Sequence, residues 1–161
     1  MSSTLSSTFY YSNIKTCILE KNKPELVFNY SDKPCPFHGK PKIVLAHKMY
    51  GFPYIDIGGI YGISNRDNYV ILERNLLDMV RISDFLSTKL ALYLFECTRY
   101  RMKYLEKYIF ELIPDITKIP NFPEYITDES AAEFFGFSLE ENEGIQKLHK
   151  KTYERIINNN Q

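Results

Sequence analysis

The chain has 161 residues, with 20 basic and 20 acidic side chains, so its formal net charge at pH 7 is zero. This length fits one domain with a small appendage, and it allows a substantial core without disulfide or metal staples. The neutral total argues against an indiscriminate polyanion binder, whereas 44% hydrophobic and 25% charged residues leave the fold class open.

The cysteines and the N-terminus indicate a soluble intracellular protein. Cys17, Cys35 and Cys97 form an odd, widely spaced set, which is typical of a reducing compartment rather than of a disulfide framework. The N-terminus lacks the basic start and apolar run of a secretory signal, and no apolar stretch is long enough to span a membrane. We therefore expect a cytoplasmic or nuclear location, with no secretion and no membrane partner.

The first 40 residues show little regular pattern, and we expect a partly ordered N-terminal extension. Phe9–Leu19 and Leu26–Tyr30 are candidate strands. Lys33–Pro41 contains three prolines and is typical of a loop.

From Lys42 the pattern predicts an antiparallel β-meander. Its expected strands are rich in β-branched and aromatic residues. Gly58-Gly59 and the segment 64–68 supply the turns. The strands are predicted over Lys42–His47, Tyr54–Ile57, Ile60–Ile63 and Tyr69–Leu72.

Helical periodicity follows the meander. Ser83 is a suitable N-cap for a mostly buried helix over Asp84–Cys97. A second, more polar amphipathic helix is predicted over Arg101–Leu112, and Pro114 ends it.

The C-terminal part predicts a helical hairpin. Thr127 caps a short helix that runs to Phe135 and ends at Gly136, and Ser138 with Glu141 forms a capping box for a last helix that reaches Ile157. The expected fold class is therefore α+β: a small antiparallel β-meander packed on helices, with a C-terminal helical hairpin. The units are the extension at 1–40, an α+β domain at 41–123, and an acidic hairpin with its tail at 124–161.

Charge is distributed unevenly along the chain. Residues 124–143 carry seven acidic side chains and no basic one, so the remainder is clearly basic. A basic face can therefore exist on this molecule despite its neutral total.

Patterns that suggest metal binding or catalysis are weak. Cys35 and His38 form one close pair, to which Cys17 or His47 would have to add the further ligands that structural zinc needs. No serine or cysteine nucleophile lies in a recognisable catalytic frame, and the glycines at 58–62 lack the Lys-Ser/Thr ending of a phosphate loop. We expect no catalytic residues and no metal site in this chain.

A run of basic and aromatic residues carries the most suggestive chemistry. On a helix, its members would form one face that can contact phosphates and stack on bases. The alternative is a solvated helix whose tyrosines pack onto the meander. The residues of this candidate face are Tyr100, Arg101, Lys103, Tyr104 and Lys107.

Loop residues of the meander extend the candidate surface. Lys42 and Lys48 are candidate phosphate contacts, and Asn65 and Arg66 are candidate readers of base edges. Tyr50 and Tyr61 are further aromatic candidates, although tyrosines at such positions more often fill cross-strand sites.

The order of these pieces resembles the C-terminal target-recognition region of adenine-specific DNA methyltransferases from type II restriction-modification systems, including versions carried by giant DNA viruses. The resemblance spans Pro41–Ile145. Ser87-Thr88-Lys89 departs from the family's Ser-Lys element because Thr88 stands between the serine and the lysine. The matching pieces are Lys42-Ile43-Val44, Gly59-Ile60-Tyr61-Gly62-Ile63, Phe85-Leu86-Ser87-Thr88-Lys89 and Phe110-Glu111-Leu112-Ile113-Pro114.

The resemblance implies a DNA-binding specificity module without its catalytic body. The glycine-rich turn that binds S-adenosylmethionine and the Asn/Asp-Pro-Pro-Tyr/Phe loop that holds a flipped adenine do not occur in this sequence. The chain would bind no cofactor itself, and S-adenosylmethionine would act only through a separate methyltransferase; the partners would be DNA and a methyltransferase or nuclease subunit. The alternatives are a protein-protein interaction subunit, a vestigial fragment without a nucleic-acid role, and an enzyme of unrecognised type.

Overall fold

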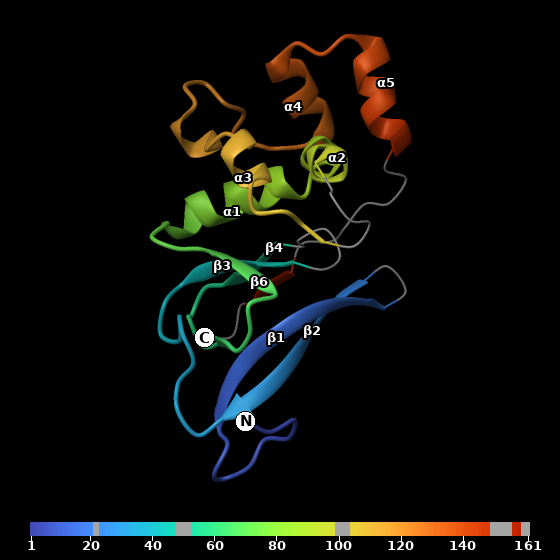
Figure 1. Ribbon diagram of the computed structural model, residues 1–161. Helices are drawn as coiled ribbons and strands as arrows, with labels where there is room; N and C mark the ends of the chain where they lie inside the picture. The colour runs from blue at the N-terminus through green and yellow to red at the C-terminus, as the bar shows by residue number, and fades with distance from the viewer. Residues whose placement is uncertain (21–22, 48–52, 99–103, 149–155, 159–161) are drawn as a thin grey trace.

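The computed structural model describes residues 1–20, 23–47, 53–98, 104–148 and 156–158. They form three layers: a long β-hairpin, a four-stranded sheet, and helices on the far side of that sheet (Figure 1). The predicted α+β class is confirmed. Within the described ranges, no helix has the length and apolar character needed to cross a bilayer.

The hairpin consists of β1 (Tyr11–Glu20) and β2 (Lys23–Ser31), which pair antiparallel along their whole length. Both predicted N-terminal strands are therefore present, and the second is longer than expected. The register shifts between Ile14 and Thr16, so Lys15 forms a bulge. Ile14 is fully buried, which makes the N-terminal segment part of the core. The expected loop at residues 33–41 contains no helix or strand.

The central sheet has the strand order β6-β3-β4-β7 and is covered on both faces. Its strands are β3 (Lys42–Ala46), β4 (Pro53–Asp56), β6 (Asn68–Ile71) and β7 (Ile156–Asn158). Successive side chains of a strand point to opposite faces. Ile43 and Leu45 pack with the helices, whereas Val44 packs with Ile14 of the hairpin. Every residue of β3 is buried, which explains the uninterrupted apolar run of this strand.

The strand order differs from the consecutive meander that the sequence predicts. Instead of continuing the sheet from β4, the chain turns away, and β5 (Gly62–Ile63) pairs parallel with β1 of the hairpin. β6 then returns to the far side of β3. A Cβ at Gly62 would collide with the Asn13 amide oxygen and lie 2.7 Å from Cys35 Cβ, so glycine is what permits this close approach.

The single helix predicted over Asp84–Cys97 is wrong. The structure has two helices, α1 (Leu76–Leu86) and α2 (Lys89–Cys97), and Ser83 is buried inside α1 instead of capping it. Thr88 explains the break because its hydroxyl accepts from Ala91 N at 3.2 Å and donates to Phe85 O at 2.7 Å. Asn75 is the true N-cap of α1.

The helix predicted over Arg101–Leu112 is also largely wrong within the described residues. Only α3 (Ile109–Leu112) is helical, and Tyr104–Lys107 precedes it as irregular chain. Leu105 N donates to His47 O at 2.7 Å, which holds this segment in an extended path beside β3. The proline stop is confirmed, since α3 ends before Pro114. A short 3-10 turn, η2 (Ile116–Lys118), follows.

The C-terminal helical hairpin is confirmed, with one correction. α4 (Asp128–Phe135) begins at its Thr127 cap and ends at Gly136, whose φ is 69°. α5 (Leu139–Leu148) begins with the expected contacts between Ser138 and Glu141. This helix is described from Leu139 to Leu148 and does not reach Ile157, because residues 156–158 form β7 on the free edge of β4. Ile156 and Ile157 are β-branched, which favours a strand there.

A pair of glycine substitutions tests the close approach of β5 to β1. We expect Gly62→Ala to lower the free energy of unfolding by about 1–3 kcal/mol, because the added methyl overpacks the contact with Asn13 and Cys35. Gly144→Ala is the control: it lies in α5 with open space around its Cβ and is expected to stabilise by up to about 1 kcal/mol. Urea denaturation of both variants measures this difference, and equal effects would contradict the proposed contact.

Candidate functional site

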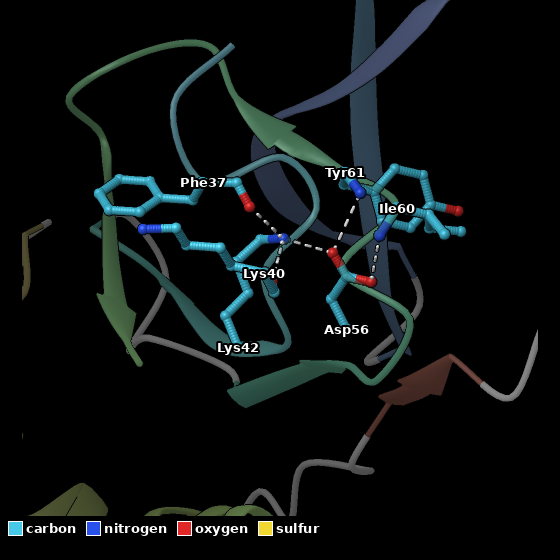
Figure 2. Close-up of polar contacts among 6 residues, drawn as sticks. All are labelled: Phe37, Lys40, Lys42, Asp56, Ile60 and Tyr61. Carbon is cyan, nitrogen blue, oxygen red and sulfur yellow. Dashed lines mark hydrogen bonds and ion pairs between the residues drawn. The ribbon is translucent and has the colours of Figure 1, made fainter. Parts of the chain in front are cut away.

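A buried ion pair fixes the junction between the hairpin and the sheet (Figure 2). Lys42 Nζ lies 2.5 Å from Asp56 Oδ2, and both side chains are fully buried. The same ammonium donates to Phe37 O at 3.2 Å and to Lys40 O at 3.1 Å. Its three protons are therefore all engaged within the protein.

The carboxylate of Asp56 organises the turn that follows β4. Its Oδ1 accepts from Ile60 N at 3.0 Å, and its Oδ2 accepts from Tyr61 N at 3.1 Å. Gly59 completes the turn with a φ of 64°, where its Cα lies against the backbone of Lys40. The pair thus joins the loop before β3 to the turn that leads into β5.

This geometry corrects the predicted role of Lys42. Burial lowers the pKa of its ammonium, and the hydrogen bond and charge of Asp56 oppose that shift. A DNA phosphate cannot reach a fully buried group whose donors are already used. Lys42 is a structural residue and leaves the set of candidate phosphate contacts.

His47 joins three segments that are far apart in the sequence. Its backbone N–H donates to Asp67 O at 2.7 Å, and its carbonyl accepts from Leu105 N at 2.7 Å. The loop 64–68, the end of β3 and the segment 104–107 therefore meet at one point. Each of these segments carries or directly adjoins predicted contact residues.

Aromatic rings surround this meeting point. The His47 ring stacks on Tyr104 with centroids 5.0 Å apart and meets Tyr69 edge-on at 5.5 Å. The Tyr69 hydroxyl donates to Leu105 O at 3.0 Å. Tyr69 thus fills a position in the sheet and packs against the core, while Tyr104 stays half-buried beside the junction.

Asn65 and Arg66 line a surface recess of about 490 Å³ at the end of β5, together with Asn68 and Cys35. The Asn65 amide oxygen accepts from Asp67 N and from the Asn68 side chain, which shapes the loop. The Asn68 amide oxygen is buried and has no hydrogen-bond partner within the described residues. Arg66 is exposed at the recess.

β6 connects this recess to a second group of candidate residues. It is an edge strand of the sheet within the described ranges, and Arg66 lies two residues before its first residue. Tyr69, Val70 and Ile71 line a cavity that Lys107 also lines. Lys107 is exposed, so an exposed cation lies at this cavity as well as at the recess.

The remaining predicted residues are not part of this surface as described. Tyr61 is half-buried, and its ring packs on Phe28 with centroids 4.9 Å apart. This ring therefore fills space within the protein and does not form part of a DNA-contacting surface. The other predicted contacts lie outside the described residues: Lys48, Tyr50, Tyr100, Arg101 and Lys103.

Sequence reasoning missed two residues of this surface. The sequence suggests His47 as a metal ligand and as the last residue of a strand, but it does not predict that this residue joins distant segments. Asn68 lies in a predicted turn, and no local pattern distinguishes its buried amide. Both acquire their positions from backbone contacts to distant segments, namely Asp67 and Leu105 for His47 and Lys15 O for the Asn68 side chain.

Cys35 and His38 share one turn, in which His38 N donates to Cys35 O at 3.2 Å. Among the described residues, no three His, Cys, Asp or Glu side chains gather closely enough to hold a metal ion. No group in this part of the chain is therefore placed as a metal ligand.

The comparisons with known proteins found no relative. No protein-family model, no curated protein and no solved structure matches this chain.

Lys42→Met tests the buried pair. Removing the ammonium leaves the Asp56 carboxylate buried and uncompensated, which is expected to cost about 3–5 kcal/mol of unfolding free energy or to prevent folding. Lys40→Met is a matched control two residues away: its side chain is exposed, and we expect a change within about 0.5 kcal/mol. Urea titration measures both, and a Lys42→Met cost as small as that of the control would refute the structural role.

Proposed function

We propose that this chain is a DNA-recognition module, related to the target-recognition region of adenine-specific DNA methyltransferases. It would contact DNA through the loop 64–68, the His47 junction and the segment 104–107. The observation that carries this proposal is the junction itself, because His47 brings together three segments that each carry or adjoin residues predicted from the sequence as DNA contacts.

The chemistry of the surface suits a duplex. Arginine is the commonest reader of guanine edges, and Arg66 is exposed at the recess, while Asn65 beside it shapes the loop and keeps its amide nitrogen as a donor. Lys107 provides a cation for phosphate beside the cavity that β6 also lines. The net charge of the protein is zero, so its affinity for DNA must come from individual contacts and not from overall electrostatic attraction. A surface with few cations is consistent with this.

The family resemblance supports the same function and limits its scope. The pieces that resemble the methyltransferase region are present, and the motifs for S-adenosylmethionine and for a flipped adenine are absent from the sequence. The module would therefore act with a separate methyltransferase or nuclease subunit. That partner would bind the cofactor and perform the chemistry.

Salt-dependent binding of Arg66→Ala to duplex DNA tests the proposal. We expect affinity to fall about tenfold, because one base or phosphate contact is lost. Lys147→Ala is the control, since it also removes one positive charge from an exposed position but lies on α5. Fluorescence anisotropy at two salt concentrations measures both variants. No binding by the native chain at low salt, or equal losses in the two variants, would refute the assignment.

A second candidate function is docking of a protein partner on the C-terminal hairpin. Leu139 is 85% exposed and Tyr125 is 82% exposed, within a stretch dominated by acidic side chains. Exposed apolar residues framed by one sign of charge suit a partner that is basic and partly apolar.

Surface variants separate this function from DNA binding. The double variant Leu139→Ser, Tyr125→Ser is expected to abolish co-purification with a catalytic subunit and to leave DNA affinity unchanged. Both side chains are exposed and lie outside the segments that form the His47 junction. A change in DNA affinity with unchanged co-purification would reverse the two assignments.

A further inference from the structure

A cavity of about 400 Å³ lies between β6, α1 and the segment 107–116. Its walls are mainly apolar side chains from all three elements, including Ile71, Phe85, Phe110 and Ile113. The Tyr69 and Phe110 rings meet edge-on at 5.3 Å and form part of one wall. Sites for small molecules have this size and this kind of lining, with a few polar groups placed at one edge.

Four charged residues lie among the lining side chains, and one of them is already satisfied. Asp115 Oδ2 accepts from Arg74 Nη2 at 2.7 Å and lies 3.6 Å from the Lys118 ammonium. Its Oδ1 accepts from the Thr117 hydroxyl at 2.7 Å and from Thr117 N at 3.3 Å. These contacts, led by the Thr117 hydroxyl, hold the pKa of Asp115 below its ordinary value. The carboxylate is therefore occupied, and it holds Arg74 at the cavity.

The hydrogen-bond donors that remain free at the cavity belong to two cationic side chains. Arg74 uses one of its terminal nitrogens for Asp115, and its remaining N–H groups make no other contact within the described residues. Lys107 is exposed and forms no ion pair in the same part of the chain. Glu111 is the remaining carboxylate of the lining, and it is exposed to solvent. The lining thus carries two cations and two carboxylates; Asp115 is paired with Arg74, and the donors that remain for a ligand belong to Lys107 and Arg74.

We propose that this cavity binds a small amphipathic carboxylate, of the kind represented by a medium-chain fatty-acid anion. The hydrocarbon body would lie against Ile71, Phe85 and Ile113, and the carboxylate would accept from Lys107 and Arg74. Burial of the hydrocarbon chain favours binding in proportion to the apolar surface removed from water, and the cations select the sign of the head group. This site is separate from the recess at Asn65 and Arg66, but it shares Lys107 with the proposed DNA surface, so binding is measured without DNA.

Titration with decanoate, kept below its micelle concentration, tests the proposal by methyl NMR of the full-length chain. We expect saturable shifts of the Ile71, Ile113 and Ile116 methyl groups, which line the cavity. Decyltrimethylammonium, which has the same chain and the opposite charge, is expected to bind at least tenfold more weakly. Equal binding of the two amphiphiles would overturn the choice of an anionic ligand.

Two charge reversals locate the head group. Lys107→Glu is expected to weaken decanoate binding on the order of tenfold, since an attractive contact becomes repulsive. Lys33→Glu changes the net charge equally at an exposed loop position away from the cavity, and it is expected to have no effect. Absence of saturable binding, shifts confined to methyl groups elsewhere, or equal effects of the two variants would each overturn the site.

Discussion

The buried pair between Lys42 and Asp56 is the contact on which the layered arrangement depends. A buried charge is tolerated only when its partners are complete, and here two backbone carbonyls and two backbone N–H groups complete the pair. Those partners belong to the loop that leaves the hairpin and to the turn that leaves the sheet. The pair therefore directs the chain after β4 away from the sheet and back to the hairpin.

The position of the candidate surface follows from that redirection. Once β5 pairs with β1, Ser64 N donates to Ile14 O at 3.1 Å, and the loop 64–68 is fixed beside the hairpin. The loop then leads into β6, which returns to β3 and brings Asp67 against His47. The recess includes Arg66 and Asn68 at the start of this returning strand, and the cavity is lined by Tyr69, Val70 and Ile71 further along it.

Local patterns predicted most elements, whereas non-local contacts decided their arrangement. The strands over Lys42–Ala46 and Asn68–Ile71 and the caps at Thr127 and Gly136 follow from residue type and spacing. The order of the strands, the break at Thr88 and the final strand at 156–158 do not, because distant partners determine them. The same holds for the candidate site: turn chemistry predicts Asn65 and Arg66, which line one recess, but the burial of Lys42 depends on Asp56, fourteen residues away.

The central claim is that DNA contacts the surface around His47, and NMR mapping with a short duplex tests it most directly. Backbone amide shifts on addition of DNA are expected to gather at His47, in residues 64–68 and in residues 104–107, and to weaken as salt is raised. Shifts gathered instead on α4 and α5, or no shifts at low salt, would contradict the account and favour the protein-docking function.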